Sequence, residues 1–447
     1  MGRRSHTQTL SLWSNGIRVG EWSVLPDGSA QLRYDPAWVD SSKGRPVSLS
    51  LPFLMGDAVH KGPAVENYFD NLLPENLNIR KRLASRFKAD STQAFDMLKA
   101  LGRDCVGALQ LLGETEEPDN VYQITAVPLD ESEVEHLLLR ASSDQPLVGD
   151  EEEDGDLRIS LAGVQEKTAL LRLGEQWYRP TGATPTSHIF KLPLGLLGHR
   201  RVDFTHSVDN EWLCLRLLSA FGLDAATADI GTFGQQRVLI VERFDRTPSD
   251  DRTWLLRLPQ EDFCQVHGLP SSKKYENEGG PGLFELSKVL DHSQTRERDL
   301  ATLLKAQLLF WMLRATDGHA KNFSIALLGG GAYQMTPLYD VMSAWPAVGA
   351  GDNQWPEQRL RLAMAVLGKS KHYRCAQVQR RHFNQTARKV GYGNDMESLI
   401  TETLDQVEEA IAAVTAVAPP DLSNLVAKRI FKGLRASAEQ LRRMAPE

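Results

Sequence analysis

The change of hydrophobic pattern along the second half of the chain constrains the fold most. Residues 157–241 contain short β-favouring runs bounded by polar residues, with one helical pattern at 207–221 among them. The runs lie at residues 157–160, 168–173, 176–179, 188–192 and 237–241. From about residue 283 onward the pattern is helical, and residues 301–316 (ATLLKAQLLFWMLRAT) are apolar on more than one face, which indicates a helix inside a core. We therefore expect a strand-rich lobe followed by a helical one.

The first third of the chain has a different pattern. Residues 8–34 alternate around the turn signals Ser14-Asn-Gly16 and Pro26-Asp-Gly28, which predicts an antiparallel hairpin. The patterns that follow predict helices at residues 67–86 and 94–101 and a strand at 106–112.

An acidic run, DEEEDGD at residues 150–156, is interpreted as a solvated linker. Its position, and a length of 447 residues, favour more than one folding unit at roughly 100–200 residues each. We expect three domains, at residues 1–149, 150–250 and 251–447.

Composition excludes several classes of protein. Hydrophobic residues at 41% and charged residues at 24% are typical of soluble globular proteins, and no run approaches the ~18 apolar residues of a membrane helix. We therefore expect no membrane partner. The four cysteines are widely spaced without a C-x-x-C pair, and residues 1–10 have no apolar secretion signal, which favours a reduced, cytoplasmic setting without structural zinc. A formal charge of −7 argues against binding nucleic acid over the whole surface, so any DNA contact would be local or made through a basic partner.

The segment Asp317-Gly-His-Ala-Lys-Asn322, followed by Asp340, carries the clearest chemical signal. Protein kinases arrange a catalytic base and two magnesium ligands with this D-x-x-x-x-N spacing and a later Asp, because phosphoryl transfer needs one carboxylate for the hydroxyl proton and oxygen ligands for Mg²⁺. Asp317 would be the base, and Asn322 and Asp340 the ligands. A solvated turn between a helix and a strand would use similar residues, so this alternative stays open.

Lys191 lies on an expected strand, and Glu211 follows near the start of the expected helix. Kinases hold the α- and β-phosphates of ATP with such a lysine, oriented by a helical glutamate. A surface lysine with an unrelated glutamate is the commoner situation, and only the order of the parts favours the functional interpretation.

The segment Ile159-Ser-Leu-Ala-Gly-Val-Gln-Glu-Lys167 lies between two expected strands, where a nucleotide-binding lobe places its phosphate loop. It is not a Walker sequence, and a plain hairpin loop is its simplest interpretation. Ser160, at its edge, is a hydroxyl near the expected phosphates and hence a candidate for self-modification.

The strand at 237–241 stops abruptly in polar residues, as a hinge between lobes would. Backbone groups of Glu242 and Phe244 are candidates for contact with an adenine edge. Alternatively, this is a buried strand end at which Arg243 and Asp245 pair. His319 is expected to shape its loop by a backbone hydrogen bond rather than to act as a base.

Together these segments resemble the HipA family, the serine/threonine-kinase toxins of bacterial HipBA toxin–antitoxin modules. The resemblance runs through nearly the whole chain and is carried by many separate motifs. They are Pro46-Val-Ser-Leu-Ser-Leu-Pro52, Phe69-Asp-Asn-Leu-Leu-Pro74, Gly102-Arg-Asp104, Val106-Gly-Ala108, residues 158–171, Val241-Glu-Arg-Phe-Asp-Arg246, residues 258–262 and 268–272, Ala315-Thr-Asp-Gly-His-Ala-Lys-Asn-Phe-Ser324 and Tyr339-Asp340.

The resemblance implies an α+β, kinase-like fold of two lobes, a mixed α/β N-terminal lobe and an all-α C-terminal lobe, with ATP and Mg²⁺ between them. Position by position, Asp317 is similar to the catalytic aspartate of the family, Lys191 to its phosphate-contacting lysine, and Asn322 and Asp340 to its metal ligands. The remaining carry-over assigns Val164, Gln165, Glu166 and Lys167 to the ATP loop, Glu242 and Phe244 to the adenine hinge, and Ser160 to the inactivating autophosphorylation site.

The resemblance also implies partners. These are a HipB-type antitoxin dimer, operator DNA reached mainly through that antitoxin, and a protein substrate, glutamyl-tRNA synthetase. Two other functions fit the residues less well. A non-catalytic nucleotide-binding corepressor would need no working Asp317, and a phosphatase or nuclease using Asp317 and Asp340 as a metal pair would leave Lys191 and the hinge without a role.

Overall fold

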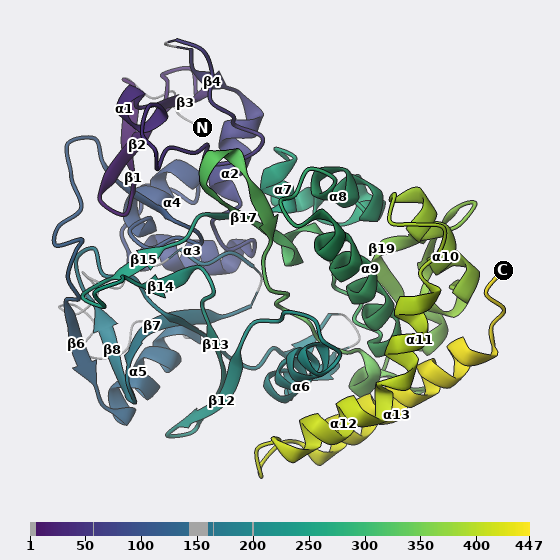
Figure 1. The fold of residues 1–447 in the computed structure, drawn as a ribbon. Helices are drawn as coiled ribbons and strands as arrows, with labels where there is room; N and C mark the ends of the chain where they lie inside the picture. The colour runs from purple at the N-terminus through teal and green to yellow at the C-terminus, as the bar shows by residue number, and fades with distance from the viewer. Residues whose placement is uncertain (1–5, 57, 143–159, 164, 199–200) are drawn as a thin grey trace.

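The computed structural model describes residues 6–56, 58–142, 160–163, 165–198 and 201–447 (Figure 1). Its N-terminal part is a five-stranded antiparallel sheet in the order β4-β3-β2-β1-β5. The strands are β1 (Gln8–Ser14), β2 (Ile17–Val24), β3 (Ala30–Tyr34), β4 (His60–Lys61) and β5 (Leu109–Gly113). The predicted hairpin is confirmed, and its first turn uses Asn15 and Gly16, both at positive φ.

Helices cover this sheet and supply its core. They are α1 (Pro36–Val39), α2 (Pro63–Asp70), α3 (Leu77–Arg86) and α4 (Ala94–Leu101). Trp22 of β2 stacks on Phe69 of α2, with ring centroids 4.0 Å apart. The single helix expected at 67–86 is two helices, because the chain between Asp70 and Leu77 contains Pro74, which cannot donate a helical hydrogen bond.

A six-stranded antiparallel sheet follows, in the order β12-β13-β9-β7-β8-β6. Its strands are β6 (Ala126–Leu129), β7 (Lys167–Leu173), β8 (Gln176–Pro180), β9 (His188–Lys191), β12 (Ala228–Phe233) and β13 (Gln236–Glu242). Four of the expected strands are confirmed as β7, β8, β9 and β13. Of the strand expected at 157–160, only Ser160 is among the described residues, and it lies outside any strand; the acidic run at 150–156 lies outside the described residues.

Two helices pack on this sheet, α5 (Glu131–Ser142) and α6 (Ser207–Ala220). Val238 and Ile240 of β13 join a core with α5, whereas Leu239 and Val241 join the core that contains α6. This alternation places the two helices on opposite faces of β13. A small hairpin of β10 (Gly195–Leu197) and β11 (Val202–Phe204) precedes α6. Since β6 and α5 belong to this unit, the sheet also uses chain before residue 150.

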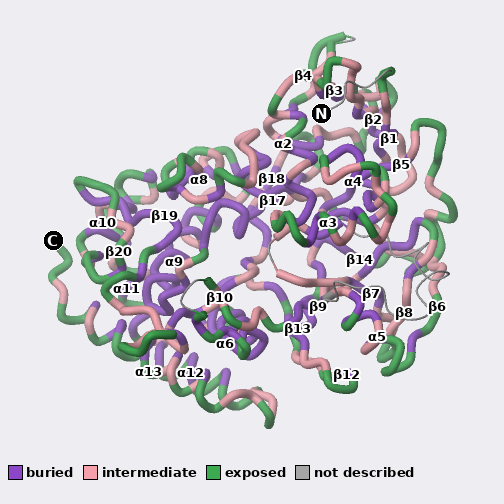
Figure 2. The backbone as a smooth tube through the Cα atoms, turned by 180° about the vertical axis from the view of Figure 1, so that it is seen from behind, coloured by how far each residue is buried: buried purple, intermediate pink, exposed green. Residues whose placement is uncertain are grey.

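The C-terminal part is mostly helical and has α9 (Arg296–Leu313) at its centre (Figures 1 and 2). Around it lie α8 (Leu283–Leu290), α10 (Arg380–Lys389), α11 (Glu397–Asp405), α12 (Val407–Ala416) and α13 (Asn424–Arg443). The predicted central helix is confirmed, although it begins earlier than expected, at Arg296. It ends at Leu313 because Arg314 adopts a left-handed conformation at φ 53°.

The mixed α/β fold is confirmed, with one difference from the expected all-α lobe. Short strands interrupt the helices after residue 245: β14 (Arg246–Pro248), β15 (Leu255–Arg257), β16 (Gln260–Asp262), β17 (Ser324–Leu327), β18 (Tyr333–Met335), β19 (Arg361–Leu367) and β20 (Lys371–Arg374), with the short helix α7 (Phe263–Val266) after β16. Several have only three residues, too few to show a period of two, so the sequence pattern did not reveal them.

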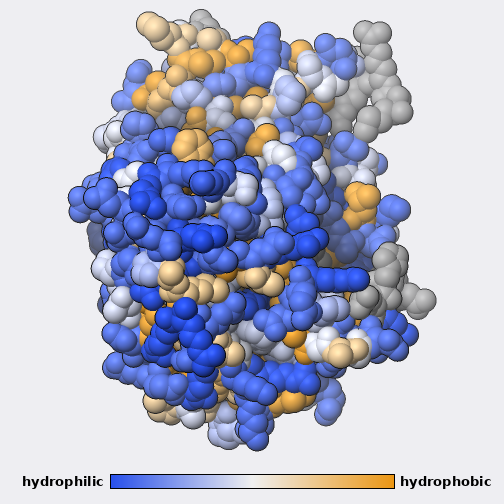
Figure 3. All heavy atoms as spheres, turned by 90° about the vertical axis from the view of Figure 1, so that its right-hand side faces the viewer, coloured by the Kyte–Doolittle hydropathy of each residue, from blue (hydrophilic) through white to orange (hydrophobic). Residues whose placement is uncertain are grey.

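The face formed by the C-terminal helices is mostly hydrophilic, with scattered apolar side chains (Figure 3). Within the described ranges, no helix is long and apolar enough to cross a membrane.

Candidate active site

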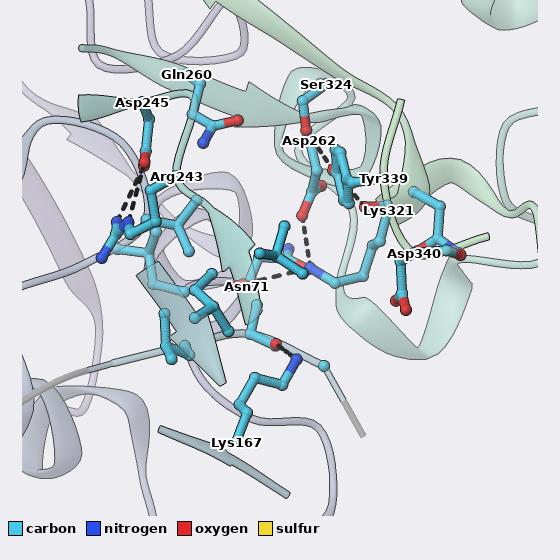
Figure 4. A pocket seen from close by; sticks show the side chains of 18 of the residues that line it. Asn71, Lys167, Arg243, Asp245, Gln260, Asp262, Lys321, Ser324, Tyr339 and Asp340 are labelled. Atoms are coloured by element: carbon cyan, nitrogen blue, oxygen red, sulfur yellow. Dashed lines mark hydrogen bonds and ion pairs between the residues drawn. The ribbon is translucent and has the colours of Figure 1, made fainter. Parts of the chain in front are cut away.

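A cleft lies where the three parts of the chain meet (Figure 4). Its lining combines Asn71 and Glu75 of the N-terminal part, Lys167 and Lys191 of the six-stranded sheet, the segment 241–245, and polar residues between α9 and residue 340. Of the residues predicted to act together, Lys191, Asp317, Asn322 and Asp340 all line this one cleft.

Lys191 ends β9 and points between two carboxylates. Its Nζ lies 2.6 Å from Oε1 of Glu211 on α6 and 2.9 Å from Oδ1 of Asp340. The ion pair expected between Lys191 and Glu211 is therefore present, and Lys191 is almost fully buried. Burial alone would lower the pKa of Lys191, but the two carboxylates hold it above its ordinary value.

Asp340 follows β18 in a left-handed conformation, at φ 58°. The backbone of Leu338 fixes this segment, since its amide donates to Asp224 and its carbonyl accepts from Ala226, which precede β12. Burial would raise the pKa of Asp340, yet Lys191 and then Lys167 hold it well below its usual range. The carboxylate is therefore ionised and placed to receive a cation.

Asn322 ends a short 3-10 turn, Ala320–Asn322, that precedes β17. Its Nδ2 donates to the carbonyl of Asp317 at 2.8 Å and to that of Asp340 at 3.4 Å. Because the nitrogen is used in this way, the oxygen Oδ1 is the atom that remains for a cation. One amide thus ties together the two loops that carry the acidic residues.

Asp317 lies at the mouth of the cleft with 51% of its side chain exposed. The Tyr275 hydroxyl donates to its Oδ1 at 2.5 Å. Despite the exposed edge, surrounding protein desolvates the carboxyl, and this burial raises its pKa to about 6. The following glycine is required, because a Cβ at Gly318 would lie 2.5 Å from the ring of Phe310 on α9.

His319 takes part in the loop through its backbone, as expected. Its amide donates to Asp317 at 2.8 Å, and its carbonyl accepts from Asn322 at 2.9 Å. Burial lowers the pKa of its imidazole to about 3, so the ring is neutral at physiological pH.

Lys167 is directly opposite Lys191 in the pairing of β7 with β9. Its Nζ donates to the carbonyl of Ala162 at 2.5 Å. Burial and the charge of Lys191 lower the pKa of Lys167 to about 8, which an anion beside it would reverse. Gly163 has φ 111°, and a Cβ there would lie 2.6 Å from this ammonium, so the loop needs glycine to approach the lysine.

Two other residues assigned to the ATP loop, Gln165 and Glu166, are not part of the cleft lining. Glu166 pairs with Arg82 of α3, and the Gln165 side chain donates to the carbonyl of Leu192. Val164 lies outside the described residues. Ser160 is 1% exposed and its hydroxyl donates to the carbonyl of Leu72 at 2.8 Å, so it faces the N-terminal part.

Glu242 and Phe244 both line the cleft, where the Phe244 ring packs 5.8 Å from that of Tyr339. The Glu242 amide already donates to Thr227 at 2.9 Å, so this donor is not free for an adenine edge. The alternative of paired Arg243 and Asp245 is also present, with Nε 3.0 Å from Oδ1. The two interpretations of this segment are compatible.

Sequence reasoning missed several residues of the cleft. Lys321 is buried, and its Nζ lies 2.6 Å from Asp262 and 2.8 Å from the side chain of Asn71 (Figure 4). Lys274 pairs with Glu75 at 2.6 Å beside Asp317. Asn71 and Asp262 belong to motifs that carry the family resemblance but were given no role, and this membership could have identified them. No sequence motif pointed to Lys274 or Tyr275.

The donor set fits magnesium and a nucleotide triphosphate. Asn322 and Asp340 offer amide and carboxylate oxygens, the ligands that Mg²⁺ prefers, and Mg²⁺ usually takes few protein ligands beside substrate phosphates. Within the described chain, no group of three or more His, Cys, Asp or Glu residues forms a metal site. The two lysines supply positive charge for phosphates, and Ile189, Val241 and Phe244 supply an apolar wall.

Comparisons with known proteins agree with the motifs. Residues 10–112 match the model of the HipA N-terminal domain, and residues 159–412 match that of the HipA-like C-terminal domain. Y4mE of Sinorhizobium fredii is 31% identical over 412 residues, covering 91% of this chain and 92% of that protein. The serine/threonine-protein kinase toxin HipA of Shewanella oneidensis is 27% identical over 383 residues, covering 80% of this chain and 79% of the toxin.

A solved structure from Shewanella oneidensis MR-1 shares the fold. It is a complex of HipA, HipB and operator DNA, and it matches with a TM-score of 0.77 at 23% identity, over 97% of both chains. Since one family model covers more than half of the chain and a 31% identical relative aligns with nearly all of it, this chain belongs to the HipA family.

Proposed function

We propose that this chain is a Mg·ATP-dependent protein kinase of the HipA type, which transfers the γ-phosphate to a protein serine or threonine. The observation that carries the proposal is the convergence of Lys191, Glu211, Asp317, Asn322 and Asp340 on one cleft. Phosphoryl transfer depends on positioning and charge stabilisation, and these residues supply both.

In the proposed reaction, Lys191 binds the α- and β-phosphates, held in place by Glu211, and Lys167 adds a second cation nearby. The rings of Phe244 and Tyr339 form one wall of the space proposed for the adenine. Magnesium, when bound, would neutralise charge on the phosphate oxygens, with Asn322 and Asp340 holding it.

Asp317 is the base for the acceptor. The acceptor hydroxyl oxygen bonds to the γ-phosphorus, the bond from that phosphorus to the β–γ bridging oxygen breaks, and the hydroxyl proton passes to the Asp317 carboxylate. The products are the phosphorylated protein and ADP. Tyr275 holds Oδ1 of Asp317, so Oδ2 is the oxygen that would take the proton.

The finer parts of the proposal rest on the family. We propose a HipB-type antitoxin dimer as the neutralising partner, contact with operator DNA mainly through that antitoxin, glutamyl-tRNA synthetase as substrate, and inactivating autophosphorylation on Ser160. We also propose a cytoplasmic location and an organisation in three domains, expected at 1–149, 150–250 and 251–447. The first limit moves to before β6, because β6 and α5 belong to the six-stranded sheet unit. A relative solved with HipB and operator DNA supports the choice of partners.

The test is transfer of ³²P from γ-labelled ATP to purified glutamyl-tRNA synthetase by the full chain, followed by phosphoamino-acid analysis. We expect phosphoserine with the wild type and none with Asp317→Ala. Growth arrest on expression separates this proposal from a non-catalytic corepressor, because a corepressor would keep its effect in Asp317→Ala. If the label stayed in ATP or appeared only as free phosphate, with none on any protein, the kinase proposal would be contradicted.

A further inference from the structure

A cluster of five buried charges includes two residues of the segment 241–245, which lines the cleft where we propose that the adenine binds. It contains Asp104 of the N-terminal part, Asp245 and three arginines, and each of these residues is at most 8% exposed. The arginines are Arg243, Arg246 and Arg257. Gly102-Arg-Asp104, a motif without an assigned role, therefore meets the hinge motif Val241-Glu-Arg-Phe-Asp-Arg246 at one place.

Arg243 uses all five of its N–H groups inside the protein. Nε donates to Oδ1 of Asp245 at 3.0 Å, and Nη2 donates to Oδ2 of Asp245 at 3.0 Å and to the carbonyl of Cys105 at 2.8 Å. Nη1 donates to Oδ2 of Asp104 at 3.1 Å and to the hydroxyl of Thr186 at 2.9 Å. A guanidinium has five such donors in a fixed plane, so none remains for a ligand. Any effect of Arg243 on a nucleotide must therefore be indirect.

The side chain of Asp104, in the N-terminal part, accepts a hydrogen bond from Arg243. Its Oδ2 also accepts from the amide and hydroxyl of Thr186, and its Oδ1 accepts from Arg246 at 2.9 Å and from Arg257 at 3.3 Å. Burial would raise the pKa of Asp104, but the three arginines hold it far below its usual range. The carboxylate is thus a permanent anion with little freedom to move.

Arg243 stands between Glu242 and Phe244, the two residues that the resemblance assigns to the adenine hinge and that both line the cleft. Its side chain is held by five hydrogen bonds and its amide donates to the carbonyl of Ser187 at 2.9 Å, so the backbone of the hinge is anchored at Arg243. Buried ion clusters contribute little net stability compared with apolar packing, and their better-supported effect is to fix geometry.

We infer that Asp104, acting through Arg243, is a positioning residue that sets the backbone of Glu242 and Phe244 for recognition of the purine edge. This inference rests on the proposed ATP binding and adds to it a dependence on the N-terminal part. That part therefore contributes to nucleotide choice without touching the nucleotide at Asp104, which is absent from the cleft lining.

The test compares dissociation constants for Mg·ATP and Mg·GTP, measured by calorimetry on the full chain, with the melting temperature recorded for each variant. We expect the wild type to prefer ATP. Arg243→Lys keeps the charge but loses the planar guanidinium. The ratio of the GTP to the ATP dissociation constant should therefore fall by about tenfold, which corresponds to the loss of roughly one hydrogen bond to the nucleotide.

Arg380→Lys is the matched control. Arg380 is another arginine that pairs with a carboxylate, that of Glu397, but it lies on α10, outside the cluster and outside the cleft lining. This variant should lower the melting temperature and leave the ATP preference unchanged. Thr186→Val, which removes one hydroxyl of the cluster, should reduce the preference in the same direction as Arg243→Lys and serves if that variant does not fold.

The outcomes are distinguishable. A wild type that binds no ATP overturns the proposed function together with this inference. Two results would overturn this inference and leave the proposed function standing, provided that the wild type binds ATP. One is an ATP preference kept in both Arg243→Lys and Thr186→Val, and the other is a preference lost equally in Arg380→Lys.

Discussion

Lys191 and Glu211 meet inside the cleft, with Nζ 2.6 Å from Oε1, although one ends a strand of the six-stranded sheet and the other lies in α6. Both are buried, and the same ammonium also reaches Asp340. The contact between Lys191 and Asp340 links the strand-rich part to a proposed metal ligand.

The first prediction concerns this ion pair. Glu211→Gln removes the charge that orients Lys191 and should reduce kcat/KM for ATP on the order of 10²-fold, as losing one preorganised electrostatic contact does. Asp229→Asn is the control. Asp229 forms an exposed ion pair with Arg216, which lies on the same helix as Glu211, and exposed ion pairs contribute little to stability. Equal activity of both variants in ³²P transfer would contradict the assigned role of Glu211.

The second prediction concerns Asp317. Asp317→Asn should reduce transfer by about 10²- to 10⁴-fold, because it removes the proton acceptor. Binding of ATP and the melting temperature should change little, since half of this side chain is already exposed. Single-turnover transfer and nucleotide titration on the same preparation check the two halves. A proportional loss of binding and transfer would mean that Asp317 binds nucleotide rather than accepts the proton.

The third prediction concerns pH-dependent stability. Glu261 of β16 is buried, its Oε1 accepts from the Leu49 amide at 2.7 Å, and its Oε2 lies 2.5 Å from the Ser48 hydroxyl. Burial raises its pKa to about 8. Because the folded state keeps a proton that the unfolded state releases near pH 4.5, this contribution is complete below that value and is lost as pH rises to about 8.

Urea unfolding between pH 5 and 9 measures this loss, which is at most about 1.4 kcal/mol per pH unit. Glu261→Gln imitates the neutral form, so its free energy of unfolding should fall less over the same range and should differ from the wild type most above about pH 8. Parallel curves for the two proteins would show that Glu261 is already ionised in the folded state.

The fourth prediction concerns Ser160. Its hydroxyl donates to Leu72 and its amide to the carbonyl of Asp104 at 3.0 Å, in a position with no room for a phosphate. Phosphorylation of Ser160 must therefore break these contacts, and the added charge of roughly −1.5 to −2 would oppose ATP in the adjoining loop. Mass spectrometry after incubation with ATP should place one phosphate on Ser160, and Ser160→Ala should retain transfer to substrate. A phosphate mapped only to other residues would remove the proposed switch.

The strands and helices that form the cleft were largely predictable because they are long enough to show a period. The runs that became β7, β9 and β13 and the apolar pattern of α9 are of this kind. The order of these elements also indicated Glu211 as the partner of Lys191, a contact that residue spacing alone does not reveal.

Other parts of the cleft could not be predicted, for two physical reasons. The three-residue strands β16 and β18, which hold the loop of Asp317 and Asn322, are too short to have a pattern. The contact of Tyr275 with Asp317 joins residues 42 positions apart, and the hold of Asp104 on Arg243 joins residues 139 positions apart. Only the folded chain brings such pairs together.

The most direct test of the central claim is a crystal structure of the full chain with magnesium and a non-hydrolysable ATP analogue. The account predicts the triphosphate beside Lys191, magnesium bound by Asn322 and Asp340, and the base against Phe244. A nucleotide bound elsewhere, or one whose phosphates lie away from Lys191 and Asp340, would contradict it.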